Sequence, residues 1–423
     1  MTYEFEYLTH LLGAAARGSS VEAPRQEIDW KKLFDLADAQ MLTPLICNVM
    51  VKQPVTGCPA DLLGSRSEAA KLKAMKECAK RLMVIGLLSD MEKAGFHAVV
   101  VKGSIVAVNY ASPENRFSTD TDILIDAKDE EAVCEFLRHR GCEVSPRWEN
   151  GHHAVAKHPA MGVLEVHVKL YDEMIEDVWF ANVDTDSFIC QPHQKIMTAE
   201  GPCFTLGNTD HLLFVILHMV KHFINTGMCL RMMTDTALMI HANKDDLDMD
   251  RIWSVLRALK FDRLVSAILW AMVRYCGFDE KDFIGIGAYE PKQVEMLLTD
   301  LEVGGFLGFN DAENRLDGRA EYNRRMLTKD RSKLSYWLYM INWQHSFKLS
   351  TLFPGKKRLA YQYPCVEKHP WLIPFVWIHR LIFRGTKVLF GKNNVTKPIV
   401  FDEDKLSEEG KARVALFQSF DMI

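Results

Sequence analysis

The sequence predicts an α+β protein in which a mixed β-sheet with helices lies between an N-terminal helical segment and a mainly helical C-terminal domain. Changes in the spacing of apolar residues support this prediction. Apolar residues follow helical spacing over residues 1–95, form short runs separated by turns over residues 96–207, and return to helical spacing over residues 208–423. We expect these ranges to be three domains, with the α/β range as the core.

Helices are expected in the N-terminal range because apolar residues recur there at positions that share one helical face. They cover residues 3–17, 29–50 and 65–94. Pro54 and Pro59 mark a break before the last of them. This range therefore reads as a helical subdomain.

Strands and one helix are expected in the α/β range. The strands cover residues 97–102, 120–126, 142–147, 152–157 and 163–169. The helix, residues 129–140, begins with acidic residues, ends with basic ones and stops at Gly141, as expected for a helix matched to its dipole and ended by glycine. Residues 180–207 are less regular.

Further helices are expected in the C-terminal range, over residues 210–240, 249–259, 262–275 and 291–301. The highly charged residues 311–333 are expected to be a solvated loop or an exposed helix. Residues 379–392 alternate aromatic and basic side chains, which suits an amphipathic helix on the core, although a membrane surface or a nucleic acid is a possible partner.

The overall composition is that of an ordinary globular protein. The 423 residues are 48% hydrophobic and 25% charged, and the net charge of −5 argues against a protein built mainly to wrap nucleic acid. Ten scattered cysteines without CxxC pairs suggest reduced thiols. The N-terminus lacks the pattern of an export signal, and residues 371–383 are too short to span a bilayer. We expect a cytoplasmic protein.

A glycine turn in the α/β range predicts a phosphate site. Val99–Val101 read as a buried strand, Lys102, Gly103 and Ser104 as a turn, and Ile105–Tyr110 as the start of a helix. Free N–H groups at a helix N-terminus favour anions, and glycine lets a ligand approach the backbone closely. Gly103 and Ser104 are therefore candidates to bind phosphate oxygens.

Two aspartates on the next strand predict a metal site. Asp120 and Asp122 are one residue apart, so both side chains point to the same face of a strand and can reach one metal ion. Such carboxylates suit Mg²⁺ or Mn²⁺ that is also held by substrate phosphates. The alternative is a solvated strand end without a ligand.

Glu165 is the candidate third carboxylate. In the segment LEVHVK, alternation places Leu164 on the core side and Glu165 on the other. Glu165 would complete a two-metal centre with Asp120 and Asp122, and it could accept a proton from an attacking hydroxyl group. Otherwise it is an ordinary exposed strand residue.

Two cations are candidates to contact triphosphate oxygens. Lys102 and Arg116 flank the glycine turn and the aspartates, and stabilisation of phosphate charge is the main contribution that a protein makes to phosphoryl chemistry. Either could instead pair with Asp120 or Glu114 and only hold the turn in place.

The motifs VVVKGS, NRFSTDTDILI and LEVHVKL together resemble the bacterial nucleotidyltransferase family of unassigned substrate within the DNA polymerase β-type superfamily. This resemblance implies a nucleotidyltransferase core with Asp120 and Asp122 as metal ligands and Glu165 as the third acidic residue. The segments DHLLFVILHMVKHF and LRMMTDTALMI look like the helical half of that family. The residues in familiar places there are Asp210, His211, His218, His222, Arg231 and Asp235. Ser118-Thr119 departs from the small or glycine-containing residues more usual before the first aspartate.

Histidines on one helical face have several interpretations. His218 and His222 have the i, i+4 spacing of metal ligands, with His211 on the same face, but no HExxH glutamate lies between them. Hydrogen bonds in the core or a place in the cleft between the two halves fit this pattern better than zinc. His152 and His153 on an adjoining strand have no distinguishing pattern.

These features lead to the hypothesis of a Mg²⁺-dependent nucleotidyltransferase that moves a nucleoside monophosphate from an NTP to a hydroxyl or phosphate acceptor and releases pyrophosphate. The acceptor, whether a small molecule, tRNA or protein, has no signature in the sequence. One rival is a glycosyltransferase that uses DxD to bind a metal and a nucleotide-sugar. Another is a non-catalytic nucleotide-binding partner protein.

Overall fold

The computed structural model describes residues 1–145, 147, 151–171, 180, 190–306, 308, 369–377 and 408–423. The chain divides into one compact unit of Met1–Arg319 with Glu408–Ile423, and a second unit, Ala320–Ser407. In the second unit the described residues include the short 3-10 helix Pro370–Leu372. The segments 311–333 and 379–392 lie outside the described residues, so the expectations for them stay untested, and of the segment 371–383 the structure describes residues 371–377.

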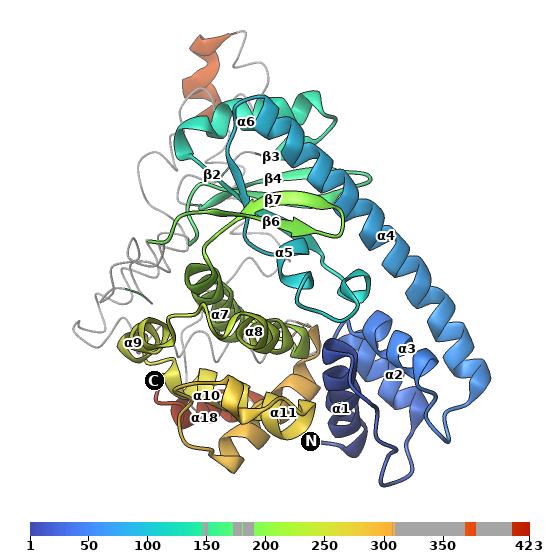
Figure 1. Cartoon of the computed structure of the whole chain (residues 1–423). Coiled ribbons are helices and arrows are strands. Elements are labelled where there is room, and N and C mark those ends of the chain that lie inside the picture. The colour runs from blue at the N-terminus through green and yellow to red at the C-terminus, as the bar shows by residue number, and fades with distance from the viewer. Residues whose placement is uncertain are drawn as a thin grey trace. The chain divides into compact units, whose positions relative to one another are not determined.

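Four helices form the N-terminal part, as the apolar spacing predicts. They are α1 (Tyr3–Arg17), α2 (Trp30–Ala39), α3 (Thr43–Lys52) and α4 (Ala60–Lys93). The predicted helix over 29–50 is in fact two helices. Asp29 caps the first by accepting a hydrogen bond from Lys32 N, and Pro44 lies in the first turn of the second. The long α4 then runs from this part to the sheet (Figure 1).

The sheet has seven strands in the order β3-β4-β5-β2-β1-β7-β6. The strands are β1 (Ala98–Val100), β2 (Asp120–Ile125), β3 (Glu143–Ser145), β4 (His153–His158), β5 (Gly162–His167), β6 (Gln194–Thr198) and β7 (Gly201–Thr205). It is mixed, because β2 is parallel to β5 but antiparallel to β1. The predicted α+β class is confirmed. The β6–β7 hairpin lies within the less regular residues 180–207, where Met197 is 72% exposed and blurs the alternation.

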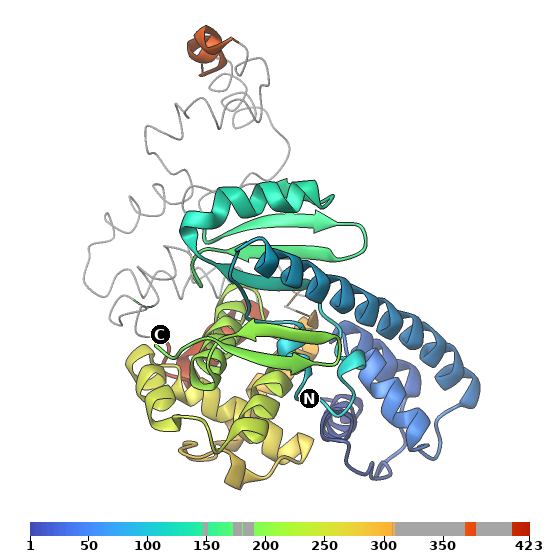
Figure 2. The ribbon, with the colours of Figure 1, turned by 45° about the horizontal axis from the view of Figure 1, so that its top comes forward.

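The hydrophobic core of the sheet lies on the face covered by α4 and α6 (Glu130–His139) (Figure 2). Strand alternation decides which side chains reach this core. Ile123 of β2 and Leu164 and Val166 of β5 are buried in it. Asp122 and Glu165 therefore point to the opposite face, as the period of two predicts.

The helices after the sheet are packed together with α1. They are α7 (Asn208–Asn225), α8 (Leu230–Asn243), α9 (Met249–Leu259), α10 (Asp262–Cys276), α11 (Pro291–Gly304) and α18 (Glu408–Ser419). Figure 1 shows α7 and α8 on the side of the strands away from α6. Among the described residues, no helix is both long and apolar enough to cross a membrane.

Gly13 provides a test of how closely α1 packs on α10. A Cβ atom at position 13 would lie 1.9 Å from the carbonyl oxygen of Cys276. Gly13→Ala is therefore expected to lower the free energy of unfolding in urea by about 1–3 kcal/mol, because the two backbones must separate.

Gly86 of α4 is the matched control, since a Cβ atom there would meet no heavy atom within 4 Å. Gly86→Ala should raise the free energy of unfolding by about 0.5–1 kcal/mol, as alanine is the better helix former. Equal effects of the two substitutions would contradict the close packing of α1 and α10.

Candidate active site

Two carboxylates are neighbours on the open face of the sheet. Asp122 and Glu165 are paired in register across the parallel strands β2 and β5. His167, two residues after Glu165, has its Nε2 3.1 Å from Asp122 Oδ1 and 3.4 Å from Glu165 Oε2. One donor atom from each of these residues lies within 4.8 Å of the others. This cluster has the donor types of a divalent metal site.

Lys102 supplies the nearest positive charge. It follows β1, and its Nζ lies 3.0 Å from Asp122 Oδ2 and 2.9 Å from His218 Nε2. Burial alone would favour a protonated Asp122, but Lys102 and His167 lower the pKa of this carboxyl group well below its usual value. Asp122 is therefore an anion held between Lys102 and His167.

The same contacts also shift the pKa of His167. Burial disfavours its charged form, but hydrogen bonds to Asp122 and Glu165 raise the pKa of the imidazole above its ordinary value. For Glu165, burial raises the pKa, and the hydrogen bond with His167 outweighs burial and lowers it. Both carboxylates are thus ionised near neutral pH.

The donor set fits a divalent cation. Asp122 Oδ2 is fully buried and, within the described residues, lacks a partner with hydrogen-bond geometry, although Lys102 neutralises its charge. A buried carboxylate oxygen beside a second carboxylate is a ligand type that a hard cation prefers. The ion would be held by Asp122 and Glu165, and Lys102 would be displaced from Asp122.

Asp120 lies apart from this donor cluster. It is partly exposed, its Oδ1 accepts a 3.2 Å hydrogen bond from the Thr119 hydroxyl group, and neither potential metal-binding group of the described chain includes it. Asp120 instead lines an adjoining cavity of about 60 Å³. Its role as a metal ligand stays a prediction.

The cavity is rich in donors. Its lining includes Lys102, Gly103, Arg116, His218, His222, Arg231 and Asp235. Arg116 Nη1 and Arg231 Nε are buried atoms without a hydrogen-bond partner in the described part of the chain. Buried guanidinium N–H groups that still have donor capacity beside a lysine favour an anionic ligand such as a phosphate group.

Arg116 also has a structural partner. Its Nη2 and Nε lie 2.6 Å and 3.2 Å from the two carboxylate oxygens of Asp235 on α8, and Tyr110 donates to the same carboxylate at 2.7 Å. The sequence suggested Asp120 or Glu114 as the alternative partner, but the structure gives Asp235. Sequence spacing alone offered no signal for this pair, which joins the sheet to the helical half.

Gly103 and Ser104 form the predicted turn. Gly103 has φ of 76°, a conformation that suits glycine, and Ser104 opens α5 (Ser104–Ala107). The predicted helix over Ile105–Tyr110 is shorter, since Asn109 N and Tyr110 N bond to carbonyl groups three residues earlier. Tyr110 thereby reaches Asp235.

Of the α7 histidines, His218 and His222 line the cavity. His218 and His222 are 2.8 Å apart at Nε2, and His211 Nε2 lies 2.9 Å from the Val101 carbonyl oxygen. Burial is the main cause that lowers the pKa of His222 to about 3 and of His211 to about 4. Neither potential metal group in the described ranges contains an α7 histidine.

Because the pKa of buried His211 is lowered, the folded protein is expected to lose stability in acid. An unfolded histidine binds a proton below about pH 6.5, but folded His211 does so only below about pH 4. The unfolded state therefore binds more protons in this window, and stability falls as the pH decreases. Between about pH 7.5 and about pH 5, His211 should account for a loss of about 2 kcal/mol.

His211→Gln keeps a donor for the Val101 carbonyl group but does not titrate. Its free energy of unfolding should consequently fall less steeply in acid, as measured by urea unfolding across this pH range. His139→Gln is the control, because His139 is exposed on α6. Parallel pH profiles for His211→Gln and the unmodified chain would refute the assignment of a buried neutral imidazole.

Comparison with known proteins gives one informative match. A family model described as an uncharacterised nucleotidyltransferase matches residues 26–277, which is more than half of the chain. The matched range includes the whole sheet, α7 and α8, and hence every residue of the site described above. Comparison with curated proteins and with solved structures gives no match.

Proposed function

Since this chain belongs to a family of uncharacterised nucleotidyltransferases, we propose that it transfers a nucleoside monophosphate from an NTP to a hydroxyl or phosphate acceptor and releases pyrophosphate. The reaction depends on Mg²⁺ or Mn²⁺. The observation that carries the proposal is the in-register pair of Asp122 and Glu165 beside a cavity lined by Arg116 and Arg231, each of which has one buried N–H group without a hydrogen-bond partner among the described residues.

Asp122 and Glu165 would hold the divalent ion, and Asp120, on the same strand face, would be the further carboxylate of the predicted trio. When bound, the ion supplies positive charge to the phosphates and to the attacking oxygen. The acceptor oxygen forms a bond to the α-phosphorus as the bond to the bridging oxygen of the β-phosphate breaks. Pyrophosphate leaves with that electron pair.

The remaining roles belong to side chains beside the carboxylates and around the cavity. Ionised Glu165 accepts the proton of an acceptor hydroxyl group or orients that group. Lys102 and Arg116, which line the cavity, stabilise the phosphate charge. Gly103 of the cavity lining and the adjoining Ser104, which opens α5, contact the phosphate oxygens through backbone and hydroxyl donors. These contacts hold the leaving pyrophosphate in place.

The test uses purified protein, a whole-cell extract as the source of acceptor, and each NTP labelled at the α-phosphorus. Transfer of label to an acceptor that requires Mg²⁺ or Mn²⁺, with release of pyrophosphate, is the expected result. Transfer of sugar from a nucleotide-sugar, with no label from any NTP, would favour the glycosyltransferase alternative. A stoichiometric protein partner in a pull-down without any transfer would favour a non-catalytic binding role.

A further inference from the structure

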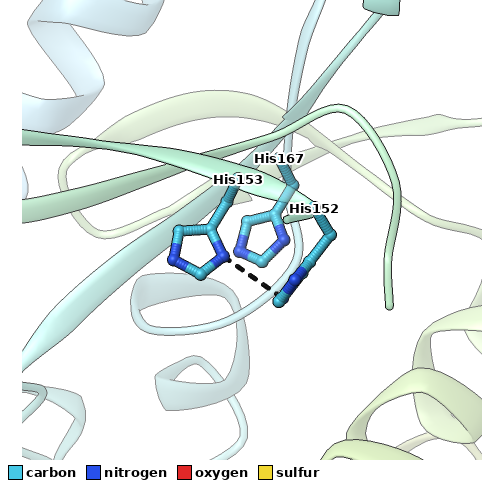
Figure 3. Close-up of side chains that lie close together, drawn as sticks. All are labelled: His152, His153 and His167. Atoms are coloured by element: carbon cyan, nitrogen blue, oxygen red, sulfur yellow. Dashed lines mark hydrogen bonds between the residues drawn. The ribbon is translucent and has the colours of Figure 1, made fainter. Parts of the chain in front are cut away.

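Three histidines gather at the start of β4 and the end of β5 (Figure 3). His153 opens β4 and pairs in register with His167, the last residue of β5, and His152 immediately precedes β4. One ring nitrogen from each histidine lies within 4.8 Å of the others. His152 and His167 are buried, and His153 is partly buried. This cluster has no role in the reaction proposed above beyond the contact of His167 with Asp122 and Glu165.

Strand pairing explains why the rings converge. Residues directly opposite on antiparallel strands have neighbouring side chains, so His153 and His167 meet on the same face. His152 joins them from the end of the strand, and its Nε2 lies 3.2 Å from His153 Nδ1. The ring centroids are 4.4–5.1 Å apart in the three pairs.

His167 has the orientation of a metal-binding histidine. Its Nε2 faces Asp122 and Glu165, whereas its buried Nδ1 has no hydrogen-bond partner in the described part of the chain. Histidines that bind metal usually donate their other ring N–H to a carboxylate or carbonyl group. His167 therefore has one ring nitrogen facing carboxylates and one open ring nitrogen, as a metal-binding histidine does.

We propose that His152, His153 and His167 form a second cation site, for Zn²⁺ or another late first-row divalent ion, next to the carboxylate site. Three imidazoles with an open fourth position are a common zinc ligand set, and imidazole favours such ions over Mg²⁺. Bonds of about 2.0–2.1 Å place tetrahedral ligands about 3.4 Å apart, and the nitrogens of His152 and His153 are already 3.2 Å apart.

One acidic and one basic side chain lie next to the three histidines. Glu165 Oε1 lies 3.9 Å from His153 Nε2 and offsets positive charge there. Lys221 Nζ, on α7, lies 3.5 Å from His152 Nε2 and must move away when an ion binds. A bound ion would fix the ring of His167 and thereby the two carboxylates that it contacts. The site does not depend on the proposed reaction, because its ligands are defined by geometry alone.

The test measures metal binding by the untagged, full-length chain after treatment with a chelator. Co²⁺ is titrated in the presence of excess Mg²⁺, and Zn²⁺ affinity is measured by competition with a chromophoric chelator. We expect one tightly bound ion per chain and the visible absorption of four-coordinate, nitrogen-bound Co²⁺. Absence of this absorption in the unmodified chain would overturn the proposal.

Variants separate the histidine site from the carboxylate site. His152→Asn with His153→Asn should weaken Zn²⁺ binding by at least about a hundredfold, since it removes two ligands. Glu165→Gln, and the exposed control His139→Asn, should retain tight binding. Loss of Zn²⁺ binding in Glu165→Gln with retention in the double histidine variant would place the ion on the carboxylates and refute the proposal. Neither result depends on whether nucleotidyl transfer occurs.

Discussion

Asp120→Asn and Asp122→Asn are each expected to reduce nucleotidyl transfer by about a thousandfold or more, yet to differ sharply in stability. Both substitutions remove a carboxylate charge from the face on which the proposed metal and triphosphate bind. Nucleotide binding that depends on Mg²⁺ should be lost in both variants, as measured by calorimetric titration of NTP with and without the ion. Unchanged nucleotide affinity in both would refute the metal-site assignment.

The stability difference follows from burial. The Asp122 side chain is 0% exposed and forms an ion pair with Lys102, so Asp122→Asn leaves a lysine charge without its partner. Breaking a buried ion pair in this way costs about 3–5 kcal/mol in the free energy of unfolding. Asp120→Asn should lower the free energy of unfolding by less than about 1 kcal/mol, because the Asp120 side chain is partly exposed.

Asp126→Asn is the matched control for both measurements. Asp126 follows β2 directly and is exposed, with Lys128 as its partner. Urea unfolding of the metal-free protein should show no loss beyond about 0.5 kcal/mol, and nucleotide binding should be unchanged. Equal destabilisation by Asp120→Asn and Asp122→Asn would contradict the buried ion pair with Lys102.

Local periodicity was enough to predict which way the site residues face. The alternation of Leu164, Glu165 and Val166 predicts that Glu165 points away from the core, and the structure confirms this for Glu165 and for Asp122. The same reasoning cannot give the register between strands. That Asp122 lies opposite Glu165 depends on the parallel pairing of β2 with β5, which long-range packing decides.

The partners of the site cations show where sequence reasoning ends. Lys102 contacts His218, and Arg116 contacts Asp235, and both partners come from the helices after the sheet. No spacing within the chain encodes such contacts, since they depend on how α7 and α8 pack below the strands. The histidine cluster could not be predicted from the sequence either, because His152 and His153 approach His167 only through the pairing of β4 with β5.

The pair of Arg116 and Asp235 is expected to be a major link between the sheet and the helices. Their side chains are 4% and 6% exposed, and Nη2 lies 2.6 Å from Oδ2. Asp235→Asn leaves the buried guanidinium group without a counter-charge and weakens the acceptor of the Tyr110 hydroxyl group. The free energy of unfolding should fall by about 3–5 kcal/mol.

The control for this buried pair is an ion pair on the protein surface. Glu135→Gln breaks the ion pair with Arg138 on the surface of α6, where the side chains are 57% and 44% exposed, and should cost no more than about 1 kcal/mol. Tyr110→Phe removes only the neutral hydrogen bond to Asp235 and should cost about 1 kcal/mol. If urea unfolding gave Asp235→Asn and Glu135→Gln similar costs, the Arg116 pair would not be the buried link described here. A large cost for Asp235→Asn alone would show that the charge of Asp235, more than its hydrogen bond with Tyr110, holds Arg116 beside the cavity.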